Sequence, residues 1–213
     1  MRIIRPGLIA RLLYPGAFFR VSSVEKVLCL TFDDGPDPES TGRFLQILGR
    51  LGIKALFFCS GNGARNHPEL MEKIRSDGHT IGNHGYLHVD GFKTSRKEYC
   101  KNVYEAAALT SSELFRPPYG RLRLSRFRTL RSEYLIFLWD VMPYDFDPAL
   151  SPLDSFSLLK RNIRNGSVIV LHDKPSSLAL EYLEEFIIFC QNDGYRFAIP
   201  IPPYRLSRQD FIS

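Results

Sequence analysis

The sequence lacks the features that mark disulfide-rich, membrane-spanning or nucleic-acid-binding proteins. Its four cysteines lie far apart and form no CxxC pair, so neither a disulfide framework nor a cysteine-based metal site is indicated. No apolar run is long enough to span a bilayer as a helix. The net charge of +5 comes from scattered basic residues without an accompanying nucleic-acid-binding motif. These absences favour an ordinary globular protein with a solvated basic surface and no nucleic-acid partner.

Residues 1–24 also lack the marks of a signal peptide, because arginines interrupt the apolar residues and no small-residue cleavage site follows. Pro6 and Pro15 argue against one continuous membrane helix. The segment either packs on the domain formed by residues 25–213 or rests on a membrane surface as a peripheral contact. We therefore expect a cytoplasmic or membrane-peripheral protein.

What is present is a chain of globular composition, with 44% hydrophobic and 24% charged residues among 213. This is enough for one domain with a sizeable core. Apolar strand-like segments alternate with helical patterns at spacings typical of βα units, which predicts a parallel α/β sheet, open or closed into a barrel. The clearest strands are expected at 27–30, 53–59, 134–141, 167–171 and 195–199, and the longest helices at 95–112 and 177–192.

Two adjacent carboxylates, Asp33 and Asp34, follow the first apolar strand, and Gly35-Pro36 then breaks the strand. Charges at the end of a buried strand are costly unless partners compensate them. In parallel α/β folds, the carboxyl ends of the strands are where active sites gather. The pair is therefore a candidate active-site feature that needs partners from elsewhere in the chain.

Three further polar clusters follow predicted strands, and strand ends that face the same side could bring them together. Among them, His84 and His88 have a spacing that can place two imidazoles on one metal ion. A strand-end aspartate would complete a His₂Asp set with a coordination position open for water, as in catalytic metal sites. An isolated HxxxH is a weak signal, so this hypothesis depends on convergence. The other clusters are Arg116 with Tyr119, and His172.

The order of four motifs resembles that of the polysaccharide deacetylases, the NodB-homology or carbohydrate esterase 4 family. The resemblance runs over residues 27–195 and implies a distorted (β/α)7 barrel in a single domain. It also implies metal-dependent hydrolysis of N- or O-acetyl groups on sugars. The motifs are TFDDGP at 31–36, GNH at 82–84 with His88, RPPYG at 116–120 and IVLHD at 169–173.

The resemblance implies roles for individual residues. Asp34, His84 and His88 look like ligands of a divalent metal, with Zn²⁺ expected and Co²⁺, Ni²⁺ or Mn²⁺ as alternatives. Asp33 looks like the general base, and Arg116 looks like the residue that orients it. A nearby guanidinium favours an ionised carboxylate, which gives this pairing a physical basis.

Further residues are implied at the leaving group and the substrate. Tyr119 looks like the backbone N–H donor to the tetrahedral oxyanion. His172 looks like the general acid, whose pKa an adjacent carboxylate would raise. Asp145 is the candidate for that carboxylate, although it could equally cap its loop. The expected substrate-binding residues are Leu171, which would line the pocket for the acetyl methyl group, Phe146 and Pro118.

The sequence departs from the family pattern in two places, after the first metal histidine and in the groove motif. The family has Ser or Thr after the first metal histidine, where this chain has Gly85. Losing that hydroxyl could weaken metal binding by about 10- to 100-fold unless another group replaces it. The groove motif Asp-x-x-Asp-Trp begins here with Met142 and ends with Phe146. Substrate identity is therefore the least determined property.

We expect a metal-dependent hydrolase that removes acetyl groups from an N-acetylated saccharide of peptidoglycan, chitin or glycolipid type. One alternative is a C–N hydrolase that acts on a small non-sugar amide, which the altered groove motif suggests. Another is a non-catalytic saccharide-binding relative, against which the intact Asp33 and His172 argue. The oligomeric state is left open.

Overall fold

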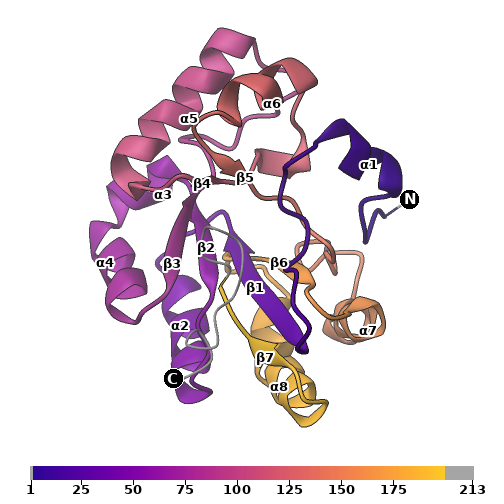
Figure 1. The fold of residues 1–213 in the computed structure, drawn as a ribbon. Coiled ribbons are helices and arrows are strands. Elements are labelled where there is room, and N and C mark those ends of the chain that lie inside the picture. The colour runs from indigo at the N-terminus through magenta and orange to yellow at the C-terminus, as the bar shows by residue number, and fades with distance from the viewer. Residues whose placement is uncertain (1, 200–213) are drawn as a thin grey trace.

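Seven parallel strands in the described part of the chain, residues 2–199, curl around a common axis in this computed structural model (Figure 1). Their order is β5-β4-β3-β2-β1-β6, and β7 pairs with the start of β1. Every pairing between these strands is parallel. The strands are β1 Val27–Asp33, β2 Leu56–Cys59, β3 Thr80–Asn83, β4 Leu114–Phe115, β5 Leu135–Ile136, β6 Val168–His172 and β7 Arg196–Phe197.

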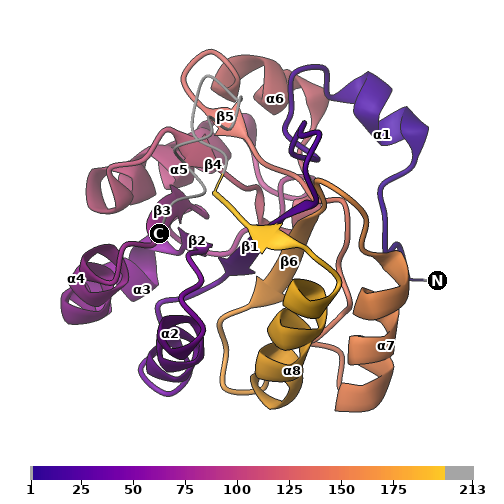
Figure 2. The same cartoon turned by 60° about the horizontal axis from the view of Figure 1, so that its bottom comes forward.

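Helices surround this sheet on its outer side (Figure 2). They are α1 Leu8–Leu13, α2 Thr41–Arg50, α3 Gly61–Asn66, α4 Pro68–Ser76, α5 Arg96–Thr110, α6 Leu124–Leu130, α7 Pro152–Asn162 and α8 Ala179–Asn192, with a 3₁₀ turn η1 at Pro118–Gly120. The predicted parallel α/β barrel is confirmed in a strongly distorted form. The strand order ends at β5 and β6. Between these two strands, isolated bridges from Phe18 to Phe137 and from Val141 to Ile169 take the place of continuous strand pairing.

Strand β1 pairs with three other strands, β2, β6 and β7. All seven of its residues are buried, and it pairs with β2 on one side and β6 on the other. Its last residue, Asp33, is in register with Phe58 of β2 and His172 of β6. The parallel arrangement therefore brings the strand-end clusters to one edge of the sheet.

The strand expected at 134–141 is mostly irregular: only Leu135–Ile136 form β5, and the Asp140 side chain binds arginines. Helix α3 begins with Ser60 as its cap, and Ser60 Oγ accepts a hydrogen bond from Gly63 N at 3.1 Å. A Cβ on Gly61 would lie 3.1 Å from Ala106 Cα, so glycine allows close packing there.

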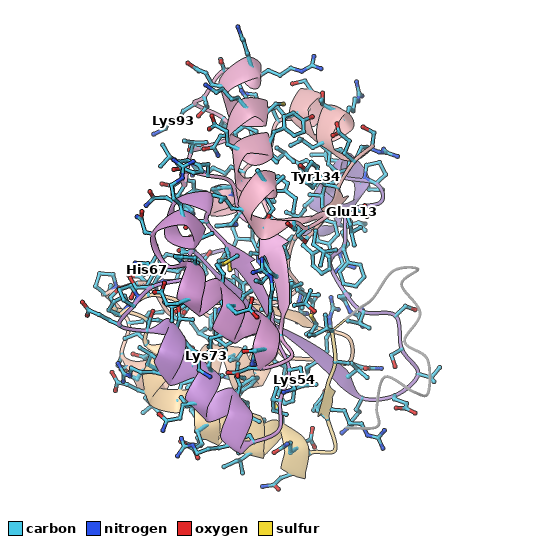
Figure 3. The ribbon with its side chains drawn as sticks, turned by 90° about the vertical axis from the view of Figure 1, so that its left-hand side faces the viewer. Lys54, His67, Lys73, Lys93, Glu113 and Tyr134 are labelled. Atoms are coloured by element: carbon cyan, nitrogen blue, oxygen red, sulfur yellow. The ribbon has the colours of Figure 1, made fainter. Side chains whose placement is uncertain are left out.

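The basic surface is solvated where α4 faces outward (Figure 3). Lys73 and Lys54 are exposed and both contact Asp77 at the end of that helix. Within residues 2–199, no helix combines the length and apolar character needed to cross a bilayer. The N-terminal segment runs along the barrel, where Phe19 and Val21 are buried.

Candidate active site

An open cleft of about 830 Å³ lies at the carboxyl edge of the sheet. The polar clusters that the sequence places after separate strands all contribute side chains to it. The residues of these clusters that line the cleft are Asp33, Asp34, His84, His88, Arg116, Tyr119 and His172. Convergence, the condition on which the metal-site hypothesis depends, is met.

Asp34, His84 and His88 form a set that fits a divalent cation. Asp34 Oδ1 lies 3.4 Å from His84 Nε2 and 3.1 Å from His88 Nε2. The three donor atoms lie within 4.8 Å of one another. Both Asp34 oxygens are buried without a hydrogen bond of acceptable geometry, although Lys174 Nζ lies 2.7 Å from Oδ2. One carboxylate and two imidazoles are ligands that Zn²⁺ and related metals accept.

The protonation states of this trio also suit a metal. Burial raises the pKa of Asp34, but the neighbouring imidazoles of His84, His172 and His88 outweigh it, so the net pKa falls below its usual value. Burial and then the neighbouring His84 lower the pKa of His88 to about 4. An ionised carboxylate and a neutral imidazole are the forms that bind metal ions.

Backbone and side-chain contacts hold the histidine loop. His84 Nδ1 lies 2.9 Å from the carbonyl oxygen of Arg116, which favours a proton on Nδ1 and leaves Nε2 free as a ligand. The Asn102 side chain accepts a hydrogen bond from Leu87 N at 2.7 Å and donates one to Leu87 O at 3.0 Å. Gly85 has φ +79°, and a Cβ there would lie 2.6 Å from Asn102 Nδ2. The loop therefore has a brace from α5 in place of a hydroxyl at Gly85.

Asn102→Ala is expected to weaken metal binding by about 10- to 100-fold, because the loop that positions His84 and His88 loses the two hydrogen bonds of the Asn102 side chain. Competition with a chromogenic chelator measures the Kd for zinc. Asn66→Ala, an exposed position at the end of α3, is the control. An unchanged Kd in a folded Asn102→Ala protein would contradict this role.

Asp33 is held by a buried arginine. Arg116 Nη1 donates to Asp33 Oδ1 at 2.7 Å and to Thr31 Oγ1 at 2.6 Å, and Nη2 donates to Leu138 O at 3.1 Å. The guanidinium lies 4.2 Å from the centre of the Phe58 ring. Arg116 is 2% exposed, so its charge acts on Asp33 with little screening by water. This contact fixes the orientation of the Asp33 carboxylate in the cleft.

His172 is paired with a fully buried carboxylate. Asp145 Oδ1 lies 2.8 Å from His172 Nδ1, and Asp145 Oδ2 accepts from His172 N at 2.8 Å and from Ser177 Oγ at 2.7 Å. Burial lowers the pKa of His172, but the charge and hydrogen bond of Asp145 outweigh it and leave the pKa raised. Asp145 thus contacts the histidine directly and also ties down the loop that follows.

Aromatic side chains form the walls of the cleft. Tyr119 has a left-handed backbone (φ 59°), and its ring centre lies 4.2 Å from that of His88. No residue within 2–199 accepts a backbone hydrogen bond from Tyr119 N–H. The Phe146 ring packs at 4.6 Å against His172 and is 40% exposed. These rings offer flat apolar surfaces on which a sugar could rest.

Two residues predicted to bind substrate do not line the cleft, and their contacts with substrate stay predictions. Leu171 is fully buried in the main core, because successive residues of a strand face opposite sides and His172 faces the cleft. Val170, two residues before His172, lines the cleft instead; the two-residue period of a strand was the available signal. Pro118 is buried at the start of η1 and does not line the cleft.

The sequence interpretation also missed cleft residues. Lys174 follows the last motif and reaches Asp34, and its proximity to His172 in the chain was a usable signal. Ile3 reaches the cleft from the N-terminal segment, where its N–H donates to Tyr144 Oη at 2.5 Å. Nothing in the sequence pattern placed Ile3 there, because only the path of the folded chain brings it to the site.

A buried aspartate supports the turn after the metal carboxylate. Asp173 accepts hydrogen bonds from Ser40 Oγ at 2.7 Å and Thr41 Oγ1 at 2.6 Å. Burial raises its pKa to about 7. A Cβ on Gly35 would lie 2.1 Å from Asp173 Oδ2, so only glycine fits beside it. The Gly35 position in the first motif thus has a packing requirement.

The parallel α/β barrel and its Asp-His-His trio, with an arginine-bound carboxylate and a carboxylate-bound histidine in one cleft, define a metal-dependent hydrolase. Comparison with known families makes this specific. The profile of the polysaccharide deacetylase family matches residues 20–133. The chain belongs to the polysaccharide deacetylase family.

Individual relatives agree with this assignment. A chitooligosaccharide deacetylase of Sinorhizobium fredii is 32% identical over 161 residues, which cover 70% of this chain and 74% of the relative. The crystal structure of a peptidoglycan N-acetylglucosamine deacetylase superposes with a TM-score of 0.83 at 26% identity, covering 90% of this chain and 94% of the other. The chain is accordingly a hydrolase of carbon–nitrogen bonds other than peptide bonds, which removes acetyl groups from N-acetylated saccharides.

Another structural neighbour is a mutant of a carbohydrate esterase 4 pseudoenzyme with restored enzymatic activity. Its TM-score is 0.77 at 25% identity, and the match covers 86% of this chain and 69% of the other. The fold therefore also occurs in an inactive relative. Because the fold alone does not distinguish active from inactive relatives, the informative property of this chain is that one cleft contains the complete set of polar residues.

Proposed function

We propose that this protein is a zinc-dependent deacetylase of N-acetylglucosamine units in a glycan or glycolipid. The observation that carries the proposal is the register of β1 and β6, which places Asp33 and His172 side by side, next to Asp34 and the two histidines. A cation held by Asp34, His84 and His88 would polarise the acetyl carbonyl and acidify water. Acetylated glucosamine is the unit shared by the two relatives' named substrates.

The residues of the chain divide the proton transfers between them. Asp33, oriented by Arg116, accepts a proton from the water that attacks the acetyl carbon. Tyr119 N–H donates to the oxyanion that develops as the carbonyl becomes tetrahedral. His172, held through Nδ1 by Asp145, gives its Nε2 proton to the amine nitrogen as the C–N bond breaks. The products are acetate and the free amine.

Acetate release from the zinc-loaded protein tests the proposal against its alternatives. Substrates are N-acetylglucosamine oligomers, acetylxylan and small non-sugar amides. We expect release from the oligomers. Release only from the small amides would favour a different C–N hydrolase, for which the replacement of the groove aspartate by Met142 in the cleft wall is the supporting observation. No release from any substrate, together with no metal binding, would contradict both.

Asp145→Asn is expected to shift the alkaline limb of the pH–rate profile to lower pH. His172 acts in its protonated form, so activity falls as pH rises through its pKa. Because Asp145 raises that pKa, its neutralisation lowers it, and activity at neutral pH falls by about 10-fold or more. The measurement is kcat/KM against pH, with exposed Asp193→Asn as the control. An unshifted alkaline limb would exclude His172 as the group that this pairing tunes.

A further inference from the structure

Helix α1 presents its apolar side to solvent. Leu8, Ile9 and Leu12 are 72%, 73% and 71% exposed, and Leu13 is 47% exposed. These positions share one face of the helix, since residues four apart lie one above the other. None of the residues of α1 is buried. A helix on a globular protein normally turns its apolar face to the core, so the polarity of α1 is inverted.

The inverted orientation is held by buried charge. Arg11 Nη2 donates to Asp140 Oδ1 at 3.1 Å, and Arg5 Nε lies 3.6 Å from the same oxygen. The Asp140 side chain is fully buried and also accepts from Arg164 at 2.6 and 3.0 Å. Ile4 packs on the main core. The contact of Arg11 with Asp140 therefore lies on the polar side of α1 and leaves its apolar side outward.

The charge around this face complements an anionic surface. Residues 2–24 contain four arginines and no acidic residue. Directly after α1, Tyr14 packs edge-on against Phe127 of α6 with ring centres 5.2 Å apart. Beside α1, the guanidinium groups of Arg5, Arg11 and Arg164 share the single carboxylate of Asp140, which leaves net positive charge next to the helix. Outward apolar side chains flanked by arginines are the pattern of segments that lie in a bilayer interface.

The same segment reaches the cleft. Ile3 is 53% exposed and lines the cleft, and α1 begins five residues later. The helix stands at the side of the barrel between α6 and α7 (Figures 1 and 2). The N-terminal segment thus connects the cleft lining at Ile3 with the exposed face of α1.

We propose that the α1 face, defined as Ile3, Leu8, Ile9, Leu12 and Leu13, docks on the surface of an anionic lipid bilayer. Docking places the cleft near the headgroups, where a lipid-anchored saccharide is presented. This consequence for substrate rests on the proposed deacetylase function, whereas docking itself does not. Four exposed apolar side chains on one helix face are more than the scattered single residues found on most surfaces.

Vesicle co-sedimentation of the full chain tests the docking without any substrate. The vesicles are phosphatidylcholine, with or without phosphatidylglycerol. We expect binding to the anionic vesicles that weakens with salt and falls at least about 10-fold in Leu8→Ser/Ile9→Ser/Leu12→Ser. The control Val24→Ser/Leu153→Ser/Ile188→Ser removes exposed apolar residues from other surfaces and is expected to bind like wild type.

Other outcomes overturn the proposal. Absence of wild-type binding, or an equal loss in the control variant, would show that α1 does not dock on lipid. Equal binding to neutral vesicles would overturn the anionic assignment. A wild-type dimer in sedimentation velocity that the α1 variant dissociates would assign the face to a second copy of the chain.

The consequence for substrate has its own readout. With N-acetylglucosamine anchored to lipid in anionic vesicles, the α1 variant is expected to show a KM raised at least about 10-fold with unchanged kcat. Its rate on soluble oligomers should equal that of wild type. A protein that docks yet releases no acetate from either substrate would contradict the proposed function and leave the docking intact.

Discussion

Asp33→Asn is expected to lower kcat for acetate release by about 10²- to 10⁴-fold while zinc content and KM stay close to wild type. An amide cannot accept the proton from the attacking water, but it nearly matches the carboxylate in shape. The metal trio does not include Asp33, so zinc binding should survive. Steady-state kinetics and metal analysis of the purified variant measure the two properties separately.

The substitution also removes the negative partner of Arg116. Arg116 is 2% exposed and keeps its hydrogen bonds to Thr31 and Leu138. Some loss of thermal stability is therefore expected. Thr31→Val is the control: it removes another contact of Arg116 and is expected to lower thermal stability in the same way, but it leaves the Asp33 carboxylate intact. If Asp33→Asn remains fully active, or if Thr31→Val loses as much kcat as Asp33→Asn, the general-base assignment fails.

His84→Ala is expected to lose metal and activity together. Its Nε2 faces Asp34, and its Nδ1 contact with the Arg116 carbonyl orients it. Removing a ligand from a three-residue set should weaken zinc binding by more than the ~10- to 100-fold cost of losing an outer contact. The measurements are the Kd for zinc and acetate release at saturating zinc.

Because His84 is buried, its loss could also disturb folding. His88→Ala, at a side chain 33% exposed, is the second variant and should show the same coupled loss. His67→Ala, whose side chain contacts only Glu69 among the ion pairs of the described chain, is the control. Full zinc affinity in folded His84→Ala or His88→Ala would remove that residue from the ligand set.

The polar residues at the strand ends were predictable because the pattern that marks them lies within a short segment of the sequence. An apolar strand followed at once by Asp33 and Asp34 and a Gly-Pro break places charge at a sheet edge, whatever the rest of the chain does. The same logic places His172 after β6. These local signals, with the alternation of strands and helices, were sufficient for the fold class and the family.

Other parts of the site depend on the side to which a residue faces. The strand period that points His172 and Val170 into the cleft points Leu171 into the core. Gly85 suggested a weakened histidine loop, but Asn102, on a helix that follows in the chain, braces it. Such contacts join residues far enough apart that no local pattern describes them.

By itself, the sequence determined the parallel barrel, the family and the polar residues that meet in the cleft, because strand periodicity and motif order are properties of short segments. Only the tertiary structure decided how the charges are compensated: Arg116 with Asp33, Asp145 with His172, and Asp140 with the N-terminal arginines. Each pair joins distant parts of the chain, and burial makes each pairing strong. The outward face of α1 also follows from such a pairing, since Asp140 draws the arginines inward.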